Sequence, residues 1–104
     1  MAPGPIGPLN CGRISFNVYQ GVGQFLIDIV GAAGAVPVRP GPPPYTQVRA
    51  DIAYTGNIWI MNTNQAGAFQ RRGTSLRQFK LPFFVDVWYR DVVTLALGGP
   101  CRIQ

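Results

Sequence analysis

The sequence predicts an all-β fold, an antiparallel β-sandwich or jelly-roll-like domain of seven or eight short strands. Apolar and polar residues alternate with a period of two in several segments, and no segment has helical periodicity. Turn residues recur about every eight to twelve positions, as in sandwiches and small barrels. A chain of 104 residues fits one domain.

Residues 1–10 are rich in proline and glycine and predict an extended N-terminal arm ahead of a single domain, 11–104. Such a segment does not order itself, so we expect it to pack on the domain or on a neighbouring subunit. It has no basic start and no apolar run, so it does not resemble a signal peptide, and no segment is apolar enough to span a membrane. We therefore expect a cytoplasmic location, or a virion location for a virion subunit; the alternative is a signal peptide that was removed ahead of these residues.

The first two strands are expected at residues 13–18 and 25–30. Ile14, Phe16 and Val18 alternate with polar residues, which is typical of a half-buried strand. The second segment is apolar on both faces except at Asp28, which predicts a central strand.

A proline-rich loop is expected at residues 36–45, because five prolines in ten residues exclude a helix and an inner strand. Within it, Pro42, Pro43, Pro44 and Tyr45 match P-P-x-Y. These four positions, and nothing beyond them, resemble the ligand of WW domains and the late-budding motif of some viral matrix and Gag proteins. The resemblance implies docking in an aromatic groove; the alternative is a rigid loop whose tyrosine packs onto the domain.

The alternation is clearest at residues 47–54, which predict a strand. Its expected core-facing residues are Val48, Ala50, Ile52 and Tyr54. Residues 55–57 predict a tight turn into a strand at 58–61. Residues 68–73 predict a short edge strand, which adjacent arginines would protect.

Three further runs complete the predicted fold. Residues 76–81 form an apolar run that Pro82 ends, and residues 83–89 alternate regularly. Residues 93–97 alternate as well, and Gly98-Gly99-Pro100 is expected to end this last strand. Arg90-Asp91 is either a turn or the middle of one long strand.

The residue types argue against an enzyme. The chain has no histidine, no glutamate, four aspartates and two serines, so a Ser-His or Cys-His pair cannot form. The separation of the two cysteines is not that of a zinc site. We therefore expect no catalytic residues, no metal and no cofactor.

Cys11 and Cys101 flank the predicted strands closely. A disulfide between them would close nearly the whole domain, and two free cysteines are the alternative. The lack of a signal peptide slightly favours free cysteines.

A basic cluster, Arg71, Arg72, Arg77 and Lys80, is the clearest candidate for contact with a partner. Nearby aromatic residues would suit single-stranded nucleic acid. Strand alternation, however, places Arg71 and Arg72 on opposite faces, and protection of an edge strand explains the arginines more simply.

Composition carries the functional hypothesis. The net charge is +5, yet only 12% of residues are charged, so much of the surface is uncharged, which favours association. We expect a non-enzymatic structural protein, a virion subunit such as a capsid decoration or cement protein or a protruding capsid domain, that self-associates on a larger particle. The alternatives are a glycan- or receptor-binding module, whose sugar contacts would come from Trp59, Trp88, Tyr45, Tyr54, Asn57, Asn62, Asn64 and Gln65, and a nucleic-acid-binding protein.

Overall fold

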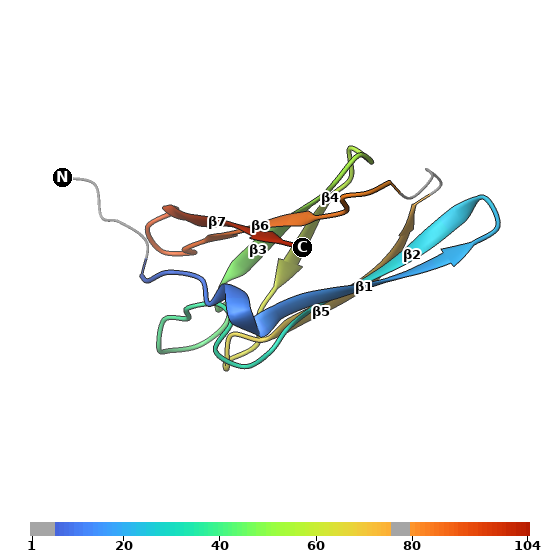
Figure 1. Ribbon diagram of the computed structural model, residues 1–104. Coiled ribbons are helices and arrows are strands. Elements are labelled where there is room, and N and C mark those ends of the chain that lie inside the picture. Colours follow the sequence, from blue (N-terminus) through green and yellow to red (C-terminus); the bar gives the residue numbers. More distant parts are fainter. Residues whose placement is uncertain (1–5, 76–79) are drawn as a thin grey trace.

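The computed structural model describes residues 6–75 and 80–104, and in this part of the chain seven strands form two antiparallel sheets (Figure 1). The only helical element among these residues is a single 3-10 turn, η1 (Cys11–Arg13). The strands are β1 (Ile14–Gly21), β2 (Gln24–Gly31), β3 (Gln47–Ile52), β4 (Ile58–Asn62), β5 (Phe69–Ser75), β6 (Val85–Arg90) and β7 (Leu97–Ile103). The prediction of an all-β fold is confirmed.

One sheet has three strands in the order β1-β2-β5. A tight turn with Gly23 at φ 73° joins β1 to β2, and the two strands pair along their whole length. β2 lies in the centre, as its two apolar faces predict. β5 forms an edge, as its arginines predict.

The other sheet has four strands in the order β4-β3-β6-β7. The β3–β4 hairpin and the long-range β3–β6 pairing place β3 and β6 at its centre. Both strands alternate strictly between buried and more exposed residues. One face of this sheet is therefore buried, and the other is open to solvent.

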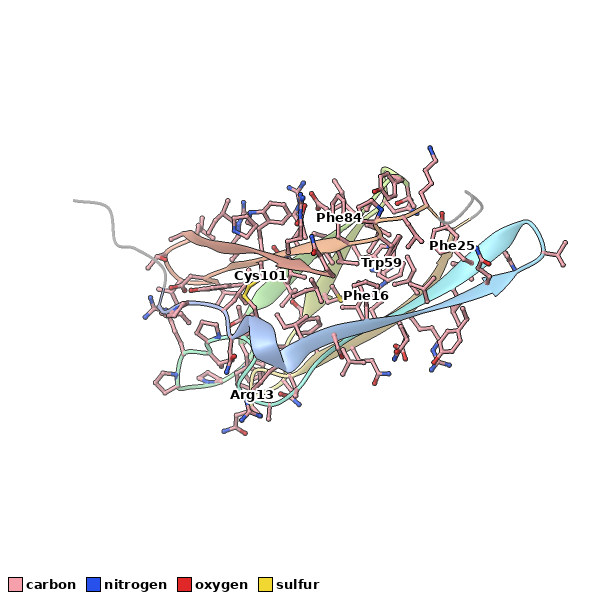
Figure 2. All side chains as sticks on the ribbon, in the orientation of Figure 1. Arg13, Phe16, Phe25, Trp59, Phe84 and Cys101 are labelled. Carbon is pink, nitrogen blue, oxygen red and sulfur yellow. A yellow bond between two sulfur atoms is a disulfide. The ribbon has the colours of Figure 1, made fainter. Side chains whose placement is uncertain are left out.

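The core lies between the two sheets, and both contribute apolar side chains to it. Phe16, Phe25 and Trp59 point into this space in Figure 2. Edge-to-face contacts join Phe83 to Phe16 and to Phe25, with ring centroids 5.3 and 5.9 Å apart. Aromatic side chains thus tie the first hairpin to the segment that precedes β6.

The described part of the predicted arm, residues 6–10, packs on its own domain. Ile6 and Leu9 contact the core. The buried Tyr89 hydroxyl accepts a hydrogen bond from the Gly7 N–H at 3.2 Å and donates one to the Gly7 carbonyl. Residues 1–5, and with them the predicted contact with a neighbouring subunit, lie outside the described residues.

Two predicted apolar positions differ from expectation. Tyr54, predicted in the core, lies beyond the end of β3, is 39% exposed and has φ 65°. The alternation of buried and exposed residues does not continue to Tyr54, because the backbone has already entered the turn after β3. The run at 76–81 lies mostly outside the described residues, and Leu81 is 80% exposed in a bend.

The prediction for the last strand is wrong. Residues 91–96 form a turn, and β7 runs through Gly98-Gly99-Pro100 rather than ending there. The Asp91 carboxylate accepts hydrogen bonds from the backbone N–H groups of Val93 and Thr94, at 3.0 and 3.5 Å, which fixes the turn.

Candidate functional site

The solvent-facing side of the four-stranded sheet, here called the outer face, is the most distinctive surface of the domain. Antiparallel pairing sets residues of neighbouring strands side by side, so its side chains form three rows across the strands. The first row is Ile58, Asp51, Asp86 and Arg102; the second is Ile60, Arg49 and Trp88; the third is Asn62, Gln47, Arg90 and Leu97.

The first row sets two aspartates directly opposite each other, Asp51 on β3 and Asp86 on β6. Like charges in this position repel, so each needs compensation. Arg49 donates two hydrogen bonds to Asp51, at 2.9 and 3.2 Å, and Arg102 donates two to Asp86, at 2.9 and 3.0 Å. These bonds raise the pKa of both arginines.

The same two arginines also lie over aromatic rings. The Arg49 guanidinium is 5.5 Å from the ring centroid of Trp88, and that of Arg102 is 3.9 Å from the centroid of Phe84. Four charges of the outer face are therefore paired within the face, and aromatic rings lie against the two arginines.

Arg90, in the third row, differs from these residues. It is exposed, and among the described residues no carboxylate pairs with its guanidinium. Because three arginines face two aspartates here, the outer face carries one uncompensated positive charge. That charge lies at the third-row end, while both carboxylates lie in the first row.

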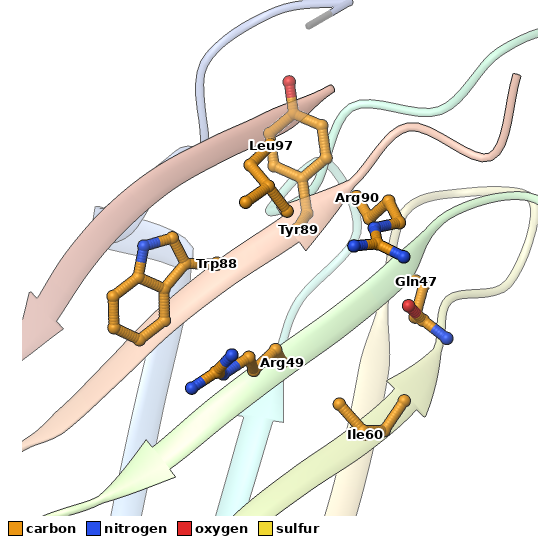
Figure 3. Close-up of a pocket in the computed structure, with 7 residues that line it drawn as sticks. All are labelled: Gln47, Arg49, Ile60, Trp88, Tyr89, Arg90 and Leu97. Atoms are coloured by element: carbon orange, nitrogen blue, oxygen red, sulfur yellow. The ribbon is translucent and has the colours of Figure 1, made fainter. Parts of the chain in front are cut away.

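A depression of about 430 Å³ crosses the second and third rows, as Figure 3 shows. Ile60 on β4 and Leu97 on β7 lie at its two sides, and Trp88 and Arg90 contribute from β6 between them. Opposite Trp88 the β6–β7 pairing shifts register, and β7 has the unpaired residues Gly99 and Pro100 there.

Apolar side chains are unusually exposed on and beside this face. Ile58 is 51% exposed, Ile60 48% and Leu97 60%. In the adjoining turn, Val93 and Leu95 are 68% and 62% exposed. Apolar residues at both edges of a charged, aromatic centre are typical of a contact surface.

The predicted basic cluster does not form one patch. Arg71 lies over the Trp59 ring, 5.2 Å from its centroid, and donates a hydrogen bond to the Ile60 carbonyl. Arg72, on the opposite face of β5, pairs with Asp28 at 3.3 Å. Lys80 lies over the ring of Tyr54, and Arg77 lies outside the described residues.

The P-P-x-Y segment lies in a surface loop. Pro42, Pro43 and Pro44 are exposed, and Tyr45 is half-buried. The loop is anchored at its start, where Arg39 donates two hydrogen bonds to Asp91, at 2.9 and 2.7 Å.

Cys11 and Cys101 form a disulfide, with Cα atoms 6.0 Å apart. The two cysteines are thus bonded, whereas the lack of a signal peptide slightly favoured free cysteines. The bond fastens η1 to β7 (Figure 2).

Every aspartate of the chain pairs with an arginine, at distances between 2.7 and 3.3 Å: Asp28 with Arg72, Asp51 with Arg49, Asp86 with Arg102 and Asp91 with Arg39. Within residues 6–75 and 80–104, no three metal-ligating side chains cluster. The carboxylates thus act as ion-pair partners in this structure.

The residues proposed for sugar contacts are dispersed. Trp59 is buried, Tyr54 lies in the β3–β4 turn, and the Asn64 side chain accepts hydrogen bonds from two backbone N–H groups of its own turn. Of these, Trp88 and Asn62 lie on the outer face. The sequence alone does not single out Ile60, Arg90 or Leu97, although strand alternation places Ile60 and Arg90 outward once the pairing is known.

None of the described helical residues makes a segment long and apolar enough to cross a bilayer. Comparison with known proteins finds no matching family model, no similar curated protein and no similar solved structure.

Proposed function

We propose that this chain is a non-enzymatic structural subunit that self-associates through its outer face and forms part of a larger particle. A virion subunit, as a capsid decoration or cement protein or a protruding capsid domain, is the most specific form of this proposal. The observation that carries it is the exposure of Ile58, Ile60 and Leu97 around Trp88, in a chain with 12% charged residues.

We take the fold to be a β-sandwich, which suits a structural subunit. The order β1-β2-β5 against β4-β3-β6-β7 resembles the constant-type immunoglobulin arrangement, except that the fourth strand pairs with the third. A jelly roll has eight strands in two Greek keys, so seven described strands in this order favour the immunoglobulin-like sandwich.

The disulfide bears on where the protein works. Disulfides persist in oxidising surroundings, including virion and cell surfaces, and are rare in the cytosol. The Cys11–Cys101 bond therefore favours an exposed virion or extracellular location over a cytoplasmic one.

We expect Ile60→Arg to abolish self-association, because it places a charge among the exposed apolar residues of the outer face. Sedimentation velocity over a concentration series measures the oligomeric mass. Thr74→Arg, on the exposed side of β5 in the other sheet, is the matched control and should assemble like the wild type. A wild-type protein that stays monomeric at every concentration would refute the proposal.

A second candidate function, glycan binding, is favoured by the depression beside Trp88. Trp88 is half-buried and lines the depression, where a sugar ring would stack on its indole, and the Gln47 amide and Arg90 guanidinium would donate hydrogen bonds to hydroxyl or carboxylate groups. Titration with neutral and acidic oligosaccharides should change the tryptophan fluorescence of the wild type. The change should be lost in Trp88→Ala and retained in Tyr19→Ala, an exposed aromatic of the other sheet. No saturable change with any sugar excludes this function.

A further inference from the structure

Building on the proposed self-association, we infer that two copies pack outer face to outer face about a two-fold axis. The axis lies in the interface, perpendicular to the strands, and passes at the level of the second row, through Trp88. Reciprocal ion pairs between Asp86 of one copy and Arg90 of the other hold the dimer together.

Symmetry limits the choices. A two-fold interface is self-complementary, and in the aligned class of sheet packing the strands of the two sheets lie within about 30° of parallel or antiparallel. The axis therefore runs either roughly along the strands or roughly across them, within the interface.

An axis along the strands sets each strand over a different strand of the second copy and keeps the three rows in register. It places β3 over β6 of the second copy, so that Asp51 lies against Asp86 of that copy, twice in each dimer. These carboxylates are already paired with arginines, but Arg90 then faces the Gln47 amide of the second copy and gains no carboxylate. Its charge stays uncompensated in the interface, which disfavours this axis.

An axis across the strands sets each strand over the same strand of the second copy and exchanges the first and third rows. It places Asp86 over Arg90 of the second copy, and Arg90 over Asp86, while Asp51 faces the amide of Gln47. The uncompensated arginine thereby gains a carboxylate. Asp86 keeps its bond to Arg102, because an ionised carboxylate can accept several hydrogen bonds.

The second row lies on this axis, so each of its residues meets its own copy. Trp88 meets Trp88 and Ile60 meets Ile60, which buries exposed apolar surface. Arg49 also meets Arg49, but its charge is already paired with Asp51 and its guanidinium lies over the Trp88 ring.

Complementary charge reversal tests the inference. Arg90→Asp sets a new carboxylate against Asp86 at two positions of the dimer, and Asp86→Arg sets a new guanidinium against Arg90. Each variant alone should therefore dimerise at least about tenfold more weakly than the wild type. A mixture of the two variants brings the introduced aspartate of one chain against the introduced arginine of the other. Sedimentation velocity of each variant and of the mixture should show two monomers that combine into a heterodimer.

Controls separate this inference from the proposal on which it rests. Thr74→Asp and Gln70→Arg change charge on the other sheet and should leave the dimer intact. Arg90→Lys keeps the charge and should dimerise, whereas Arg90→Glu should not, and melting curves show which variants are folded. Because Asp86→Arg leaves Arg102 facing a like charge, the Arg90 series serves alone if that variant does not fold.

Two results would overturn the inference in different ways. Charge variants that dimerise like the wild type, or a folded mixture without heterodimer, would reject the axis while Ile60→Arg still identifies the face. A wild-type monomer would reject both the axis and the proposed self-association.

Discussion

Removing the Cys11–Cys101 disulfide is expected to lower the free energy of unfolding by about 4–5 kcal/mol. The two cysteines are 90 residues apart, so the bond closes a loop that contains nearly all of the domain. In the chain-entropy model, the longer the closed loop, the more the bond restricts the unfolded chain. Urea denaturation of the wild type, with and without a reductant, measures the difference.

The double variant Cys11→Ser/Cys101→Ser is the control. It should match the reduced wild type in stability and should not respond to the reductant. Equal stability of the oxidised wild type and this variant would show that the bond contributes nothing. Cys101 is buried at 6% exposure, so the serine itself should cost little more than one hydroxyl in an apolar setting.

Asp91→Ala should lower the free energy of unfolding by about 3 kcal/mol, from the loss of hydrogen bonds to a buried carboxylate. Asp91 is 1% exposed, accepts two hydrogen bonds from Arg39 and caps the 91–96 turn. The matched control is Asp51→Ala, which removes an exposed ion pair and should cost less than about 1 kcal/mol. Equal losses in the two variants would contradict this difference.

Asp91 also predicts a pH dependence. Hydrogen bonding from Arg39 is the main cause that holds the pKa of the Asp91 carboxyl well below its ordinary 3.8, with further help from the backbone N–H groups of Val93 and Thr94 against the effect of burial. A carboxyl with a lowered pKa stabilises the fold fully above its unfolded value, and this contribution is lost as the pH falls below it. Urea midpoints measured from about pH 5 down to about pH 2 should therefore fall more steeply for the wild type than for Asp91→Asn, which cannot titrate.

Strand alternation could be read from the sequence wherever one face of a strand is buried. It predicts β1, β3 and β6 correctly, because in each the core decides which residues are apolar, whereas β2 is predicted by its continuous apolar run. It failed at 93–97, where the same alternation lies in a turn. There the Asp91 carboxylate accepts a hydrogen bond from the backbone, and Leu95 adopts φ 62°. Neither feature changes the alternation of apolar and polar residues in the sequence.

β7 could not be predicted, because its sequence carries strand-breaking residues and its pairing is supplied by β6. Gly98 leaves room for the Tyr89 ring: a Cβ on Gly98 would lie 2.1 Å from a ring carbon. The outer face could not be predicted for a related reason. The rows of the outer face join residues of four strands, and their register is set by tertiary pairing rather than by local sequence.

The contact of Arg71 with Trp59 has a bearing on solubility. β4 and β5 are edge strands of different sheets, and Trp59 from β4 packs over Gly73 of β5, where a Cβ would lie 2.5 Å from the indole. Open strand edges beside a large aromatic ring invite intermolecular β-pairing and fibrous aggregation. The guanidinium of Arg71 covers this ring and occupies the Ile60 carbonyl on the β4 edge. The position of Arg71 is thus that of a gatekeeper residue, which protects these strand edges from intermolecular β-pairing.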